Sequence, residues 1–287
     1  MIRATANADG PLFTLNASVS GPAIYLDNWA IGNLAEGDSS RRRRFLDVIH
    51  SGVELLFSVT NAAELSGPQG RSADAVRAFL DEIGPHWFPA RLDPTEVVKR
   101  ELKGERPDAV CIDENFLKSY VADRMRNYTP GCGKVIDLSD DFFRLGPIMD
   151  RMSSQRESIC RGAAQGDGVL RSKLNAVRER SKHDVLWLDK KFPRIPFEAS
   201  RPACFVYMNL LRIMAIEAGS LKAGDWMDFC HAVMACAFAS FATLDKHWKR
   251  RVASLPTPNR LARVYGPSEL DQMVTDMEWW LANRAAS

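Results

Sequence analysis

We predict an α/β fold in which helices cover a central parallel sheet. Short apolar runs alternate with helical segments over residues 20–102, in the order β-α-β-α-β-α, and strand-like runs return after residue 202. Parallel neighbours need crossover connections, which are usually helices, so this alternation favours a parallel sheet. The chain has 287 residues, of which 46% are hydrophobic and 26% are charged. That composition supports one folded unit with a substantial core.

The first strand is predicted at residues 23–26, an apolar run that ends at Asp27. Helical patterns follow at residues 29–34 and 39–49. Residues 55–59 form a second short apolar run, which is typical of a buried strand. The chain therefore begins its α/β pattern with a strand, helices and a second strand.

The next helix is predicted at residues 73–83, with Ser72 as its N-cap. Residues 86–88 predict a third short strand. A further helix should run to about residue 102, because Asp93 is a capping residue and Pro94 suits the first helical position.

Residues 104–202 have dense charges, clustered glycines and few β-like runs. We interpret them as a mainly helical insertion within a single domain that spans residues 20–285, with residues 1–19 as an N-terminal extension. The elements expected after the insertion are helices at residues 205–218, from residue 225 and at 268–283, and strands at residues 239–244 and 263–265.

The chain shows no targeting or disulfide signal. The N-terminal residues lack a basic segment followed by a sustained apolar one, and no apolar run is long enough for a bilayer. The six cysteines form no C-x-x-C pair, which argues against a zinc knuckle and favours reduced, mostly buried thiols. We expect a cytoplasmic protein.

Two clusters of basic residues are candidates for phosphate contact, although the net charge is only +2. The alternative for each cluster is a solvated helix face. The candidate nucleic-acid-binding residues are Arg41, Arg42, Arg43, Arg44, Arg171, Lys173, Arg178, Arg180 and Lys182.

Acidic residues follow the predicted strands or begin the helices after them. Asp27 and Asp245 come directly after strands, Glu64 lies early in the helix after the second strand, and Asp225 and Asp228 begin a helix. Functional groups of open parallel sheets gather beyond the carboxyl ends of the strands. We therefore expect these acids to converge on one edge of the sheet.

Converging carboxylates cannot all stay ionised unaided, because like charges repel. A divalent cation relieves the repulsion, and Mg²⁺ or Mn²⁺ suits ligands that are all oxygen. Such a site polarises a phosphate oxygen and activates a bound water. The sequence therefore predicts metal-dependent hydrolysis of a phosphodiester.

Four segments occur in a characteristic order: IYLD ending at Asp27, SVTNAAE ending at Glu64, DWMDFCHAVMACA beginning at Asp225, and Thr243-Leu244-Asp245. In this order and local context the chain resembles the PIN-domain family of metal-dependent ribonucleases. The resemblance covers residues 20–102 and 203–285. The long insertion is a departure from compact members of the family.

The resemblance implies a three-layer α/β/α fold and an endoribonuclease that uses Mg²⁺ or Mn²⁺, often as the toxin of a bacterial toxin–antitoxin pair or in RNA processing. Its partners would be a single-stranded RNA substrate and an antitoxin or other protein inhibitor. The implied catalytic residues are Asp27, Glu64, Asp228 and Asp245. All four would also hold metal, together with Asp225, and Thr243 would support them.

Several alternatives remain open for these residues. Asp27 could only cap its helix, and Glu64 could be a surface residue. Asp225 is a natural N-cap and Asp228 lies near the third helical position, so we prefer Asp228 as the ligand and keep Asp225 as a second ligand or a cap. His231 lies on the same helical face as Asp228 and fits a core or supporting position better than a metal-ligand position.

Two other functions compete with a nuclease. One is a non-catalytic PIN-like scaffold that binds RNA or a protein through the insertion. The other is a small-molecule phosphohydrolase, although Asp27-Asn28-Trp29 stands where one phosphatase class carries D-x-D. The tryptophans at 226, 248, 279 and 280 could stack on bases, but their apolar helical contexts favour core packing for most of them.

Overall fold

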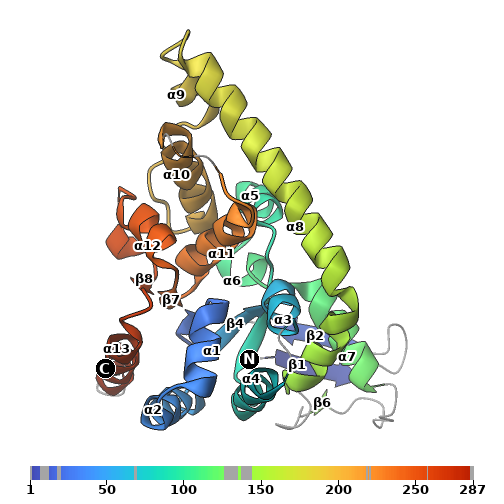
Figure 1. The fold of residues 1–287 in the computed structure, drawn as a ribbon. Coiled ribbons are helices and arrows are strands. Elements are labelled where there is room, and N and C mark those ends of the chain that lie inside the picture. Colours follow the sequence, from blue (N-terminus) through green and yellow to red (C-terminus); the bar gives the residue numbers. More distant parts are fainter. Residues whose placement is uncertain are drawn as a thin grey trace.

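A computed structural model describes residues 2–6, 13–17, 21–67, 70–125, 135–136, 144–217, 219, 221–256 and 258–284. A five-stranded, all-parallel sheet lies at its centre (Figure 1) and confirms the α/β prediction. The strand order is β5-β4-β3-β7-β8. The strands are β3 (Ala23–Tyr25), β4 (Glu54–Ser58), β5 (Trp87–Ala90), β7 (Phe241–Thr243) and β8 (Arg263–Tyr265).

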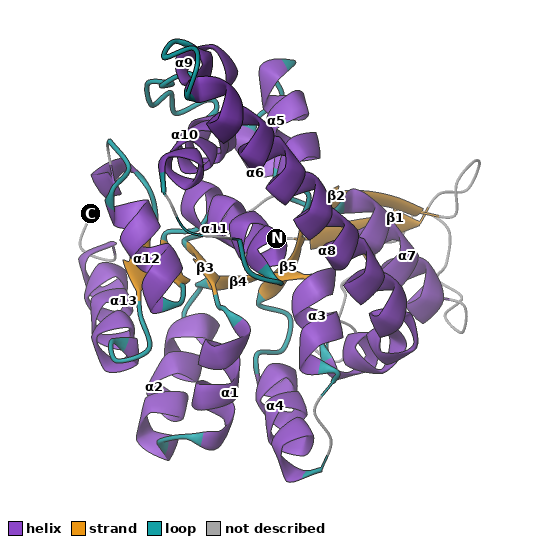
Figure 2. Cartoon of the chain, turned by 45° about the horizontal axis from the view of Figure 1, so that its top comes forward, coloured by secondary structure: helices purple, strands orange, loops and turns teal. Residues whose placement is uncertain are grey.

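Helices cover both faces of this sheet. Successive strand residues point to opposite faces, and accordingly Tyr25 packs in one hydrophobic cluster while Ile24 and Leu26 pack in the other. Figure 2 shows α10 and α11 on one side of the sheet and α1, α2 and α4 on the other. The helices that flank the sheet are α1 (Asn28–Glu36), α2 (Ser39–His50), α3 (Val59–Leu65), α4 (Arg71–Glu82), α5 (Pro94–Leu102), α10 (Pro202–Ile216), α11 (Asp225–Phe238), α12 (Lys246–Ala253) and α13 (Leu270–Arg284).

The predicted N-cap of α5 is confirmed, whereas the predicted N-cap of α4 is wrong. The carboxylate of Asp93 accepts a hydrogen bond from the backbone N–H of Thr95, and Pro94 is the first helical residue. In α4 the N-cap is Gly70, at φ 77°. Ser72 lies inside the helix and donates its hydroxyl to the carboxylate of Glu36 on α1. This interhelical partner, which is distant in sequence, replaces the local capping bond.

The middle of the chain is mainly helical, as expected. Its helices are α6 (Pro107–Val110), α7 (Glu114–Met125), α8 (Gly146–Ser181) and α9 (Trp187–Lys191). It also contributes β6 (Val135–Ile136), which pairs antiparallel with β1 (Ile2–Ala6), and β1 pairs with β2 (Phe13–Ala17). The expected N-terminal extension therefore contains two strands, and they join the middle of the chain in a second sheet.

Helix α8 is 36 residues long and packs along the body of the molecule. It contacts α3, α4, α10 and α11. The carboxylate of Asp167 accepts hydrogen bonds of 2.8 Å from the backbone N–H groups of Gly224 and Trp226 at the start of α11. The neighbouring Gly166 lies directly against the indole of Trp226. Helix α8 thus holds the start of α11, which carries Asp228.

A Gly166→Ala substitution should destabilise the protein, because the added methyl group would overlap with the indole of Trp226. We expect a net loss of about 1 kcal/mol in the free energy of unfolding, since overpacking costs more than the gain in helix propensity. Gly168→Ala in the same helix is the matched control, because no atom lies within 4 Å of the new methyl group. The control should be neutral or stabilising in urea unfolding, and equal effects of both substitutions would contradict this packing argument.

Five cysteines in the described residues are free thiols, and only Cys160 is exposed, in agreement with the expected reduced state. Cys132 lies outside the described residues. Within the same residues, none of the helices combines the length and the apolarity needed to cross a bilayer.

Candidate active site at the carboxyl edge of the sheet

The order of the strands creates one special position at this edge. Strands β3 and β7 are neighbours, and from β3 the chain builds the sheet towards β4 and β5, whereas from β7 it builds towards β8. Ligand sites of open α/β sheets lie outside the carboxyl ends of the strands at such a switch point. Asp27 follows β3 and Asp245 follows β7, so both acids lie at the switch point.

Backbone hydrogen bonds hold these two acids in place. The carboxylate of Asp27 accepts from the N–H of Asn28 at 2.7 Å and caps α1. The carboxylate of Asp245 accepts from the N–H groups of His247 and Trp248 and caps α12. The N–H of Asp27 also donates to the hydroxyl of the buried Thr243 at 2.8 Å, which ties the ends of β3 and β7 together. Thr243 thus positions the Asp27 backbone.

Glu64 reaches the same edge from α3. Its carboxylate accepts a hydrogen bond from the side-chain amide of Asn28, the residue directly after Asp27. The Oδ1 of Asn28 in turn accepts from the side-chain amide of the buried Asn61 at 3.1 Å. Asn28 therefore links Glu64 to the first strand.

The start of α11 distinguishes its two acids. Gly224, at φ 95°, is the N-cap, so the prediction of Asp225 as the cap is wrong. Asp225 is buried, and its carboxylate accepts from the N–H of Lys222 at 2.6 Å. Asp228 is exposed to solvent, and the nearby charges of Asp27 and Asp245 influence its carboxyl group. Asp228 therefore belongs to the group of edge acids, whereas Asp225 has a local partner in the turn before α11.

The edge acids raise one another's pKa values. Burial, followed by the charge of Asp245, raises the pKa of Asp27 to about 6. Burial, followed by the charges of Asp27 and Asp228, raises the pKa of Glu64 to about 7. Burial and the charges of Asp27 and Asp245 raise the pKa of Asp228 to about 6. The four carboxylates therefore share one electrostatic environment.

The arrangement is open. Neighbouring protein displaces part of the water around the carboxyl groups of Glu64 and Asp228, but both residues keep a solvent-exposed side, so water screens part of their repulsion. In the part of the chain that the structure describes, no three His, Cys, Asp or Glu side chains have the spacing to hold one metal ion together. The acids are therefore grouped more loosely than the ligands of a closed metal centre.

Two indole N–H groups lie beside the acids. Trp29 partly offsets the rise in the pKa of Asp27, and Trp248 partly offsets the rise in the pKa of Asp228. Among the described residues, their buried Nε1 atoms nevertheless have no hydrogen-bond partner of normal geometry. Since a buried polar group without a partner is costly, a small movement of either carboxylate towards the indole would be favourable.

Buried polar groups support the edge from the core. Asn61 is fully buried and accepts hydrogen bonds from the Tyr25 hydroxyl at 3.1 Å and from the Ser58 hydroxyl at 2.7 Å. The Tyr25 hydroxyl also contacts Nδ1 of His231. Burial lowers the pKa of His231 to about 4. His231 is thus a neutral core histidine, as the interpretation of the sequence favoured.

The arginine run on α2 lies away from the acids. Arg41 reaches Asn33 near the end of α1 opposite Asp27 and pairs with Asp271 at 2.7 Å. Arg42 pairs with Glu82, and Arg44 pairs with Glu278. These three arginines join α2 to α4 and α13, so phosphate contact would require breaking their ion pairs. Arg43 is exposed.

The basic residues on α8 are also partly engaged. Arg178 donates to the backbone carbonyl oxygens of Met214 and Glu217 and so caps the C-terminal end of α10. Arg180 lies 5.1 Å from the centre of the Trp187 ring, and Lys182 pairs with Glu179. The remaining two, Arg171 and Lys173, have exposed side chains.

The tryptophans have different environments. Trp248 is buried, and Trp226 and Trp280 are partly buried, which agrees with core packing for most of the set. Trp279 is 61% exposed on α13.

Two groups of residues at this edge escaped the sequence interpretation. Asn28 and Asn61 link Glu64 to the core, and only the position of Asn28 next to Asp27 offered a signal. The second group is the basic face of α12, which begins directly after Asp245. Which of its cations form ion pairs depends on Glu217 and Glu269, which are distant in sequence, so no sequence spacing reveals it.

The raised pKa of Asp27 predicts a decline in stability with pH for the metal-free protein. Its folded-state pKa of about 6 lies above the ordinary carboxyl value of about 4. The native state therefore binds more protons in this window, and stability falls as pH rises through it. Asp27→Asn removes this effect, and Asn is an equally good N-cap.

In EDTA, Asp27→Asn should be more stable than the wild type by on the order of 2 kcal/mol at about pH 8, and by much less near pH 4. Thermal unfolding at both pH values measures the difference. Asp93→Asn, at the exposed N-cap of α5, is the control. A stability gain that does not depend on pH would contradict the prediction.

The arrangement of acids at this edge of the sheet is what indicates a functional site. The switch point brings together two capping aspartates from adjacent strands, a glutamate from α3 and an exposed aspartate from α11. The resemblance to the PIN-domain family stays a prediction, because no family model, no curated protein and no solved structure matches this chain.

Proposed function

We propose that this chain is a PIN-like, metal-dependent nuclease that hydrolyses phosphodiester bonds of RNA. The observation that carries the proposal is the grouping of Asp27, Glu64, Asp228 and Asp245 at the switch point of the sheet, where burial and then the charges of neighbouring acids raise the pKa of the first three. A bound cation would relieve the repulsion between these carboxylates.

The donor set fits Mg²⁺ or Mn²⁺, because all four side chains offer oxygen ligands and two of them are open to solvent. A bound cation would polarise a phosphate oxygen and lower the pKa of a water molecule. Asp27 and Asp245 would hold it from their fixed positions as helix N-caps, and Asn28 would orient Glu64. Asp225 would act through the turn before α11 rather than as a ligand.

The biological setting is part of the proposal. A PIN-like ribonuclease of this kind would cut single-stranded RNA in the cytoplasm, in RNA processing or as a toxin held in check by a protein inhibitor. The support is the ordered set of four acidic segments together with the parallel α/β sheet.

The direct test is incubation of the purified protein with labelled single-stranded RNA and DNA in Mn²⁺ and in EDTA. We expect cleavage of RNA that requires Mn²⁺. Internal fragments among the products would show that the cleavage is endonucleolytic. A protein free of copurified inhibitor that cuts neither polymer in Mn²⁺ would refute the nuclease.

A non-catalytic scaffold is the second candidate, and the open spacing of the acids favours it. Titration calorimetry with Mn²⁺ separates the two functions. A nuclease should take up Mn²⁺ with an affinity that Asp27→Asn lowers at least about tenfold, because a charged ligand is lost. A scaffold should show no uptake that depends on these carboxylates.

A further inference from the structure

Helix α12 begins at the candidate active site and carries five basic residues, since Asp245 is its N-cap. The helix divides these residues into two sets. One set pairs with carboxylates of other segments, and the other is open to solvent. The basic residues are Lys246, His247, Lys249, Arg250 and Arg251.

The inward set anchors the helix. Arg251 is buried, pairs with Glu217 at 2.7 Å and lies 4.5 Å from the centre of the Trp248 ring. Lys249 pairs with Glu269 on the other side of the helix. These contacts fix the direction of α12 against α10 and the segment before α13.

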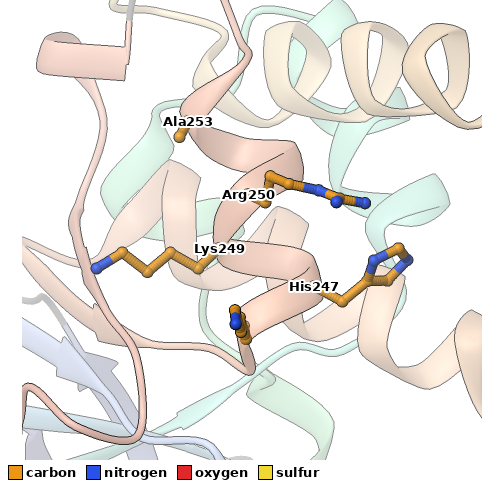
Figure 3. A pocket seen from close by; sticks show the side chains of 5 residues that line it. His247, Lys249, Arg250 and Ala253 are labelled. Carbon is orange, nitrogen blue, oxygen red and sulfur yellow. The ribbon is translucent and has the colours of Figure 1, made fainter.

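The outward set is exposed. Lys246, His247 and Arg250 are open to solvent, and none of them forms an ion pair with a described carboxylate. In Figure 3, His247 and Arg250 extend from the same side of the helix, away from Lys249. With Lys249 and Ala253 they line a surface hollow of about 500 Å³, a size that accommodates a nucleotide-sized group.

The outward set lies close to the acids along the helix. Lys246 directly follows Asp245, and Arg250 lies about 6 Å beyond Lys246 along the helix axis, at 1.5 Å per residue. An acidic centre repels a polyanion, so productive binding needs cations at its rim. Several members of the clusters on α2 and α8 are paired or cap helices, and neither cluster directly follows one of the edge acids.

We propose that the solvent-facing side of α12, formed by Lys246, His247 and Arg250, binds the phosphate backbone of a single-stranded nucleic acid and leads it to the carboxylates. The inference rests on the proposed nuclease function and adds the binding surface. Lys246 and Arg250 neutralise phosphates, and a ring N–H of His247 donates to a phosphate oxygen. The strand follows α12 away from Asp245.

The test measures binding without cleavage. Fluorescence anisotropy in EDTA follows a labelled single-stranded RNA oligonucleotide on the full chain over a range of salt concentrations. The Lys246→Gln/Arg250→Gln double variant should weaken binding at least about tenfold and reduce the slope of log affinity against log salt by about 1.4, since each phosphate contact on a single strand contributes roughly 0.7.

The matched control is Lys99→Gln/Lys103→Gln, which removes two exposed lysines at α5 and the same net charge. Its affinity should stay within about twofold and its salt slope unchanged, because those residues contact no phosphate. Circular dichroism melts should place both double variants close to the wild type, since the substituted side chains are exposed.

Three results with RNA would overturn the inference: no binding by the wild type, equal weakening by both double variants, or a salt slope that the substitutions on α12 do not change. A fourth is an acidic protein partner that binds through Lys246 and Arg250 while RNA does not, which would assign the surface to protein recognition. The nuclease proposal is judged separately by cleavage in Mn²⁺. If the wild type binds RNA through α12 but does not cleave it in Mn²⁺, only the catalytic function is refuted.

Discussion

If the chain is the proposed nuclease, Asp245→Asn is expected to abolish Mn²⁺-dependent cleavage of RNA, lowering the rate by at least about 10³-fold, because a metal ligand would supply several kcal/mol of charge stabilisation in the transition state. The fold should remain intact. The Asn side chain can still accept from the N–H groups of His247 and Trp248 that Asp245 now caps, and Asn is as good an N-cap as Asp. Single-turnover cleavage of a labelled RNA measures the effect.

The control for this experiment is Asp38→Asn. Asp38 is also a capping aspartate, but it begins α2, at the end of α1 that lies opposite Asp27. Its substitution should leave cleavage within about twofold, because only a surface cap changes. A variant at Asp245 that keeps a tenth or more of the wild-type rate would remove this carboxylate from the catalytic centre.

The second large effect is expected for stability. Asn61→Ala should lower the free energy of unfolding by about 3 kcal/mol, because it removes one hydrogen-bond partner from each of several polar groups and leaves a cavity in the core. Asn61 is fully buried, and its side chain binds the Tyr25 hydroxyl, the Ser58 hydroxyl and the side chain of Asn28. Tyr25 and Ser58 are themselves buried, whereas Asn28 is partly exposed.

Urea unfolding of Asn61→Ala beside Asn33→Ala isolates this effect. Asn33 is an exposed residue of α1 whose side chain accepts from Arg41, so its loss should cost less than about 0.5 kcal/mol. If the two variants lose the same free energy of unfolding, the buried hydrogen bonds of Asn61 do not contribute the stability expected of them. Asn61→Ala should also weaken cleavage, because Asn28 loses the partner that orients it towards Glu64.

The α/β pattern was predictable because short apolar runs and turn residues act locally. Residues 23–26, 55–59 and 263–265 read as strands and are β3, β4 and β8 within a residue or two. Asp93 and Pro94 predicted the start of α5 for the same reason, since capping uses neighbours in sequence. The order of the acids along the chain followed from these elements.

The errors occurred where a distant partner replaced a local one. Ser72 has the right type for an N-cap, but it binds Glu36 on another helix. Asp225 likewise suited a cap, but Gly224 takes the left-handed conformation there and Asp225 turns back to Lys222. Phosphate contact by the arginines on α2 stays a prediction, and the structure adds that three of them pair with carboxylates that follow by up to 234 residues.

The sequence by itself determined the α/β class, most element positions and the set of acids that follow the strands, because periodicity, capping and strand ends are local properties. The tertiary structure decided which charges are free. It gave Asp225 a local partner in Lys222, linked Glu64 to the core through Asn28, and left the exposed side of α12 without an ion pair to any described carboxylate. Whether a charge is free depends on neighbours that only the folded chain brings together.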